Sequence, residues 1–148
     1  MKPVPMSVCI AVLTLSPGFG AEKKVKMKDL PTAVQKTVQE QIKSAQLKGI
    51  SKEVENGKTM YEVETVVNGR SRDFVIDTAG TIVEVEDEVT LDRIPAPAKA
   101  AIEKSAGSGK IIKVESVTKG TTVTYEAELL KAGKKSEVAV AADGTVQK

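Results

Sequence analysis

The chain has 148 residues and a mass of 15.7 kDa, with 22 lysines and arginines against 20 aspartates and glutamates, a net charge of +2. This length fits one or two small domains, and the near-neutral balance argues against a nucleic-acid binder, which normally carries a basic stripe. The sequence has no histidine, so the commonest general base and the commonest metal ligand are missing.

Residues 1–21 have the pattern of a secretory signal peptide. Lys2 provides the positive start, an apolar stretch covers 8–15, and small residues follow at 16–21. The apolar stretch is shorter than the roughly 20 residues that span a bilayer. A lipoprotein anchored through Cys9 is the alternative, but here the apolar run follows the cysteine instead of preceding it. We therefore expect a periplasmic or secreted protein that has no membrane attachment after signal cleavage.

The rest of the chain resembles itself at an offset of 64 residues. Tyr61-Glu62-Val63-Glu64 matches Tyr125-Glu126-Ala127-Glu128 at this offset. The same offset aligns identical residues at Pro31 and Pro95, Ser44 and Ser108, Gly69 and Gly133, Gly80 and Gly144, and Thr81 and Thr145. Glycines, a proline and apolar positions that keep one register are typical of an internal duplication. The sequence therefore predicts two units, 22–88 and 89–148, which join at 84–88.

Each unit is predicted to begin with a helix. Pro31 suits the first turn of the first helix, and Pro95 suits that of the second, because the missing N–H costs nothing there. Apolar residues recur at helical spacing after each proline and form one stripe per helix: Val34, Val38 and Ile42 in the first, Ala98, Ile102 and Ala106 in the second.

Antiparallel hairpins are predicted after each helix. The Asn-Gly pairs at 56–57 and 68–69 are strong two-residue turn signals. Between them Tyr61 and Val63 fall on one face of a strand, whereas Glu62 falls on the other. A sheet with one apolar face needs a cover, which the amphipathic helix supplies. The expected fold class is α+β, with two tandem repeats, each an N-terminal helix packed on one face of an antiparallel three- to four-stranded meander.

Three segments resemble a known family. The Leu-Pro-x-x-Val opening at 30–34, the Asn-Gly-Lys-x-x-Tyr-Glu-Val-Glu hairpin at 56–64 and the Asp-x-x-Gly-Thr-Ile ending at 77–82 resemble PepSY-like domains of the β-lactamase-inhibitor-like group of bacterial periplasmic proteins. The second copy departs from this pattern through the extra Pro97 and through 121–124, which replaces the Gly-Lys opening. The resemblance implies an exported α+β protein that binds another protein or a peptide, with a peptidase as a candidate partner. It brings no catalytic residue and no cofactor.

Acidic residues are predicted on the face that the helices leave open. A two-residue turn at 68–69 would place Glu64 opposite Asp73, and the 64-residue offset would place Glu128 opposite Glu137. Like charges opposed on neighbouring strands are destabilising, which suggests a partner-binding surface made of Glu62, Glu64, Asp73, Glu126, Glu128 and Glu137. Two alternatives are a solvated face that discourages edge-to-edge aggregation and a site for a metal ion or a small ligand.

Catalysis is not expected from this pattern. Paired carboxylates or a Ser–Lys pair would need a pocket that perturbs a pKa, and an exposed sheet face is not expected to provide one. The acidic segment 77–88 lacks the Asp-x-Asp-x-Asp alternation of a calcium loop. The expected function is therefore that of an exported, monomeric, non-enzymatic binding module without cofactor, metal or nucleic acid. The alternative is an envelope protein that binds metal ions or small ligands through its acidic patches.

Overall fold

This computed structural model describes residues 22–55 and 57–147, so the expected signal peptide lies outside the described residues. The strands are β1 (Lys23–Lys24), β2 (Gln46–Glu55), β3 (Lys58–Val67), β4 (Arg70–Asp77), β5 (Ile82–Glu88), β6 (Lys110–Lys119), β7 (Thr122–Lys131) and β8 (Lys134–Ala141). The α-helices are α1 (Thr32–Gln41) and α2 (Ala96–Ala106), and 3-10 turns occupy Met27–Asp29, Ile42–Ser44 and Leu91–Arg93. Within these residues no helix has the length and apolar character needed to cross a membrane.

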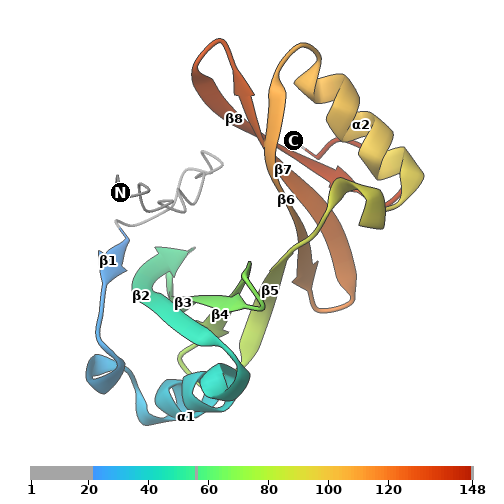
Figure 1. Ribbon diagram of the computed structural model, residues 1–148. Coiled ribbons are helices and arrows are strands. Elements are labelled where there is room, and N and C mark those ends of the chain that lie inside the picture. The colour runs from blue at the N-terminus through green and yellow to red at the C-terminus, as the bar shows by residue number, and fades with distance from the viewer. Residues whose placement is uncertain (1–21, 56, 148) are drawn as a thin grey trace.

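The eight strands form one open antiparallel sheet whose spatial order follows the sequence, β1 to β8 (Figure 1). Strand β5 pairs with β4 through 82–87 and with β6 through 85–88. The prediction of two tandem repeats, each with its own three- to four-stranded meander, is therefore wrong, because the expected join at 84–88 is a central strand. Residues 83–86 alternate apolar and acidic side chains as a strand does, and pairing both edges of β5 avoids an exposed edge.

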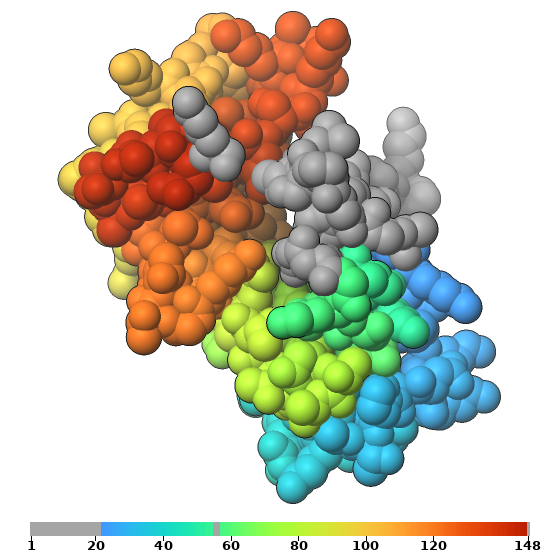
Figure 2. Space-filling view, turned by 180° about the vertical axis from the view of Figure 1, so that it is seen from behind, coloured from blue at the N-terminus to red at the C-terminus, as the bar shows by residue number. Residues whose placement is uncertain are grey.

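The two helices cover different ends of this sheet. Helix α1 packs with β2, β3 and β4, and α2 packs with β6, β7 and β8 (Figure 1). Val38 and Ile102, one from each predicted helical stripe, are both 0% exposed. The two buried clusters share no residue; the first contains Leu30, Val34, Val38, Ile50, Tyr61, Val63, Phe74 and Ile76, and the second contains Ile94, Ala98, Ile102, Ala106, Val114, Ala127, Leu129 and Val140. Figure 2 accordingly shows two lobes, with the yellow-green β5 segment between them.

The hairpin turns within the described residues have the backbone conformation that their sequences predict. Asn68 and Gly69 have φ angles of 50° and 82°, and the equivalent Ala132 and Gly133 have 49° and 77°. Positive φ at both central positions is the two-residue turn that matches strand twist. Val67 consequently pairs with Arg70 across the turn. The turn at 56–57 involves Asn56, which lies outside the described residues.

The Asp-x-x-Gly-Thr segment is a tight turn that docks on α1. Asp77 Oδ1 accepts hydrogen bonds from the backbone N–H groups of Ala79 and Thr81, each at 2.9 Å. Gly80 has φ 85°, and a Cβ at this position would lie 2.7 Å from the carbonyl oxygen of Ala33 in the first turn of the helix. The motif at 77–82 therefore sets how closely the sheet approaches its helix.

Candidate functional site

The face of the sheet opposite the two helices, called the open face below, is acidic along most of its width. Side chains alternate between the two faces of a strand, and the strand register therefore assigns each residue to one face. Every strand from β3 to β8 contributes at least one carboxylate to the open face, namely Glu62, Glu64, Asp73, Glu84, Glu86, Glu88, Glu115, Glu126, Glu128 and Glu137. All six residues of the predicted surface belong to this set.

One of the two predicted carboxylate pairs is present in the register. Glu128 lies directly opposite Glu137 on β7 and β8. Glu64 and Asp73 do not form a ladder pair, because the β3–β4 ladder is interrupted between the Val63–Phe74 and Val66–Ser71 pairs, although both of these pairs keep the predicted register.

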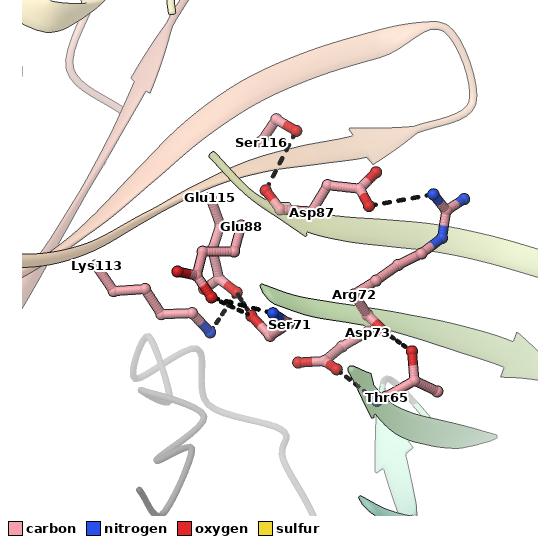
Figure 3. A network of polar contacts seen from close by, with 9 residues as sticks. All are labelled: Thr65, Ser71, Arg72, Asp73, Asp87, Glu88, Lys113, Glu115 and Ser116. Atoms are coloured by element: carbon pink, nitrogen blue, oxygen red, sulfur yellow. Dashed lines mark hydrogen bonds and ion pairs between the residues drawn. The ribbon is translucent and has the colours of Figure 1, made fainter. Parts of the chain in front are cut away.

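Asp73 causes this interruption by bonding to the neighbouring backbone. Its Oδ1 accepts a hydrogen bond from the N–H of Thr65 at 2.9 Å, while the Thr65 hydroxyl donates to the carbonyl oxygen of Arg72. Side chains thus replace direct ladder bonds at this point (Figure 3). Asp73 is only 4% exposed, so it is a structural acceptor as well as part of the acidic face.

The residues that sequence reasoning missed lie at the centre of the sheet. Glu86 on β5 is registered with Asp73 on β4 and with Val117 on β6. Carboxylate oxygens of Asp73, Glu86 and Glu115 lie within 4.8 Å of one another. Strand β5 therefore joins the two predicted acidic groups into one surface. The alternation of apolar and acidic residues over 83–86 was the signal that could have assigned this segment to a strand.

Several of these carboxyl groups are protonated more readily than usual. Desolvation, followed by the charges of Glu115 and other carboxylates, raises the pKa of Glu86 to about 8. Desolvation and the neighbouring Glu53 raise the pKa of Glu62 to about 7. Burial and a hydrogen bond with Glu126 raise the pKa of Glu137 to about 8. The expectation that this face cannot raise a carboxyl pKa is therefore wrong.

The pKa of Asp73 is raised less, to about 6. Desolvation raises it, whereas the hydrogen bond from Thr65 and the charge of Lys113 lower it. A carboxylate that accepts a backbone hydrogen bond is stabilised in its charged form. Asp73 consequently loses its proton before Glu86 does as the pH rises.

Lysine side chains and one serine connect parts of the acidic face. Lys113 Nζ lies 2.5 Å from Glu115 Oε1, and Lys135 pairs with Glu128. The Ser71 N–H donates to Glu88 Oε2 at 3.0 Å, and the Ser71 hydroxyl lies 3.3 Å from carboxylate oxygens of both Glu88 and Glu115 (Figure 3). These contacts link β4, β5 and β6 on the open face.

This arrangement can attract and hold positive charge. Clustered carboxylates with partial burial interact strongly with a cationic side chain, because both charges are weakly screened there. Asp73, Glu86 and Glu115 are the described residues whose oxygens are close enough together to share one divalent cation. Carboxylate oxygens are the ligands that Ca²⁺ and Mg²⁺ prefer.

Comparison with known proteins identifies the fold. No protein-family model and no curated protein matches the chain. Among solved structures, a DUF2874 family protein from Bacteroides ovatus ATCC 8483 is 18% identical, with a TM-score of 0.61 over 80% of this chain and 85% of that one. A proposed periplasmic protein from Bacteroides eggerthii DSM 20697 is 19% identical, with a TM-score of 0.65 over 80% and 86%.

A third similar structure is that of a BLIP-like protein from Bacteroides fragilis NCTC 9343. It is 15% identical, with a TM-score of 0.57 over 80% of this chain and 84% of that one. At these identities the likeness concerns the fold alone. It agrees with the β-lactamase-inhibitor-like part of the sequence resemblance, and the three names do not mention PepSY, which stays a prediction.

Proposed function

We propose that the chain is an exported, non-enzymatic binding module whose open face takes a positively charged segment of another protein or of a peptide. The observation that carries this proposal is the gathering of carboxylates from every strand between β3 and β8 on one face. Lysines on the same face, such as Lys113 and Lys135, pair with some of these carboxylates and leave the face acidic. Charge complementarity of this kind selects partners and speeds their association.

Export and a binding role have further support. The signal-peptide pattern of 1–21 favours export, as does the proposed periplasmic location of the Bacteroides eggerthii protein with the same fold. The BLIP-like name of the Bacteroides fragilis protein favours binding over catalysis. A peptidase remains the candidate partner that the sequence resemblance implies, and the chain is proposed to act as a monomer.

The test compares two charge reversals of equal size. Glu64→Lys with Glu128→Lys changes the open face in both halves of the sheet, whereas Glu40→Lys with Glu103→Lys changes exposed positions on α1 and α2. Each immobilised variant is exposed to a bacterial envelope extract, and proteins retained by the unmodified chain are then purified and titrated individually. We expect the open-face variant to lose a partner that the helix variant keeps.

Equal retention of the purified partner by both variants would contradict the proposal. A broad hydrolase screen of the purified chain addresses the competing enzymatic class. Turnover that disappears in Glu86→Gln and persists in Glu103→Gln would place the chain in that class instead.

A second candidate function is the binding of a divalent cation. It is favoured by the 4.8 Å grouping of carboxylate oxygens from Asp73, Glu86 and Glu115. Calorimetric titrations with Ca²⁺ and with hexalysine distinguish the two candidates. Saturable Ca²⁺ binding that Glu115→Gln removes, without hexalysine binding at physiological ionic strength, would favour the cation site.

A further inference from the structure

Strand β8 is the last strand of the sheet, and only one end of its outer side is paired (Figure 1). The Ala141 N–H donates to the Thr145 carbonyl oxygen, and the Gln147 N–H donates to the Ala139 carbonyl oxygen, each at 2.8 Å. Among the residues that the structure describes, none makes a backbone hydrogen bond to the outer side of residues 134–138. We call this outer side the β8 edge.

The backbone groups of Lys135 and Glu137 point outward from the β8 edge. In an antiparallel ladder, successive residues of a strand direct their N–H and C=O groups to opposite sides in alternation. Ala139 and Ala141 form their bonds on the outer side, and the β7–β8 ladder continues without a register shift from there to the turn. Lys135 and Glu137 therefore offer outward N–H and C=O groups, and a row of this kind is a template for another strand.

The other exposed edges of the sheet are less suited to strand addition. The outer side of β2 is paired with β1 at 51–52 and has a register shift between Leu47 and Gly49. The part of β6 that extends beyond β5 has a register shift between Ile111 and Lys113. Such irregularities bend a strand and end its pairing. The β8 edge keeps the regular register that an added strand needs.

Strand β5 shows how a strand lies in the equivalent position on β4. The turns after β4 and β8 make the same two contacts, a backbone hydrogen bond and a bridge between apolar residues: Asp77 with Thr81 and Ile76 with Ile82 after β4, Ala141 with Thr145 and Val140 with Val146 after β8. After this bridge, β5 continues antiparallel to β4 through 84–87. The geometry of β4 and β5 is therefore a template for a segment that lies along the β8 edge.

The side chains of β8 define what such a segment must carry. Phe74 on β4 is registered with Val85 of β5 and is 2% exposed, whereas its counterpart Val138 on β8 is only partly buried. An apolar residue opposite Val138 would remove this remaining surface from water. The neighbouring Glu137 favours a basic residue opposite it, and Lys135 favours an acidic one. Charged side chains on an edge also exclude strands that lack complementary charges.

We propose that the β8 edge receives an extended segment of a partner protein as a ninth strand, antiparallel to β8, with an apolar residue opposite Val138, a basic residue opposite Glu137 and an acidic residue opposite Lys135. Backbone hydrogen bonds to Lys135 and Glu137 provide affinity, and the three side-chain pairs provide specificity. This contact uses the edge of the sheet and not the open face, so binding at the two places is independent.

A synthetic strand tests this proposal by NMR titration of the whole chain. The probe is acetyl-Val-Lys-Val-Glu-Val-amide, which carries the proposed pattern. We expect saturable binding with a dissociation constant of about 1 mM or lower and slower amide exchange at Lys135 and Glu137. The peptide with lysine and glutamate exchanged should bind about fivefold more weakly, because it opposes like charges. Unchanged exchange at Lys135 and Glu137 at saturation, or no saturable binding, would overturn the proposal.

Methylated peptides test the backbone contacts directly. In the proposed register the N–H groups of the probe's lysine and glutamate face β8, whereas that of its central valine faces away. N-methylation of the lysine and glutamate should weaken binding about tenfold or more, because it removes both donors, and N-methylation of the central valine should leave most of the affinity. Equal affinities of the two methylated peptides would overturn the proposal.

Variants of the chain test the same edge from the other side. Lys135→Pro removes an outward N–H that the ladder with β7 does not use, and Lys135→Thr removes the same side chain but keeps that N–H. The proline variant should bind the probe about fivefold more weakly than the threonine variant; equal affinities would overturn the proposal. If Lys135→Pro does not fold, the methylated peptides decide.

Two further measurements separate this edge from other modes of binding. Glu64→Lys, on the open face of β3, should bind the probe like the unmodified chain, and loss of probe binding in this variant would place the peptide on the open face instead. Analytical ultracentrifugation without peptide addresses a second copy as the occupant. A dimer that Lys135→Pro dissociates would overturn the assignment to a partner protein.

Discussion

Asp73 on β4 and Glu86 on β5 are registered neighbours near the middle of the sheet, and both are carboxylic acids. On its other side Glu86 faces Val117, which is 1% exposed. A carboxyl group between an acid and a buried apolar side chain is most stable when it is protonated. Carboxyl groups of the open face therefore keep their protons near neutral pH, and for this reason the stability of the folded protein depends on pH.

Stability is expected to decrease as the pH rises from about 5 to about 8. The folded-state pKa of Glu62 is about 7 and that of Glu86 and of Glu137 is about 8, all above the ordinary value of 4.5. The folded state thus binds more protons than the unfolded state over this range, and the free energy of unfolding falls with pH. Urea unfolding at constant ionic strength measures this free energy. A rise in stability toward pH 8 would contradict the raised pKa values.

At lower pH this trend reaches a limit. The carboxyl groups with raised pKa values make their full contribution to stability once the pH lies below their unfolded-state pKa values near 4.5. Asp92 and Asp143 have lowered pKa values, because Asp92 pairs with Lys99 and Asp143 accepts a hydrogen bond from the backbone N–H of Thr145. Their small favourable contributions disappear in stronger acid, so we expect maximum stability near pH 5.

Substitutions of Asp73 distinguish its hydrogen bond from its charge. Asp73→Asn keeps a side-chain oxygen for the Thr65 N–H and should change the free energy of unfolding at pH 8 by less than about 1 kcal/mol. Asp73→Ala leaves the Thr65 N–H without this acceptor and should cost about 1–3 kcal/mol. Urea unfolding of both variants measures the difference. Equal losses in the two variants would mean that the negative charge matters more than the hydrogen bond.

Two glycines with the same backbone conformation provide a matched pair. Gly80 has φ 85° and a position for Cβ that lies 2.7 Å from the Ala33 carbonyl oxygen, whereas Gly69 has φ 82° and nothing within 4 Å. Gly69→Ala should cost about 1 kcal/mol from the left-handed conformation, and Gly80→Ala about 3 kcal/mol because the clash with α1 adds to it. Chemical unfolding checks both. Similar losses would show that the turn can move away from the helix.

The separation of the two buried clusters predicts additive mutations. Ile76 and Ile102 are both 0% exposed and belong to different clusters. Each change to alanine should cost about 2–5 kcal/mol, and at pH 5.5 the double variant should lose the sum, since distant sites without shared partners are independent. A double-mutant cycle with a coupling above about 1 kcal/mol would indicate that the clusters communicate through the sheet.

Local features of this protein were predictable because they depend on near neighbours in the chain. The helical stripes containing Val38 and Ile102, the positive-φ turn at Asn68 and the assignment of Glu62 to the face away from the core all follow from short-range periodicity and turn chemistry. The Glu128–Glu137 pair also follows, because a two-residue turn determines the register of its hairpin.

The amino-acid sequence by itself determined which residues form helices, hairpin turns and an acidic strand face. The tertiary structure decided that β5 completes one continuous sheet, that Asp73 accepts a hydrogen bond from the backbone of Thr65, and that Glu86 and Glu115 lie close to Asp73. The physical reason is that pairing between β5 and β6 and the desolvation of carboxyl groups both depend on segments brought together only by folding. A repeating pattern along the chain does not specify which strand edges pair.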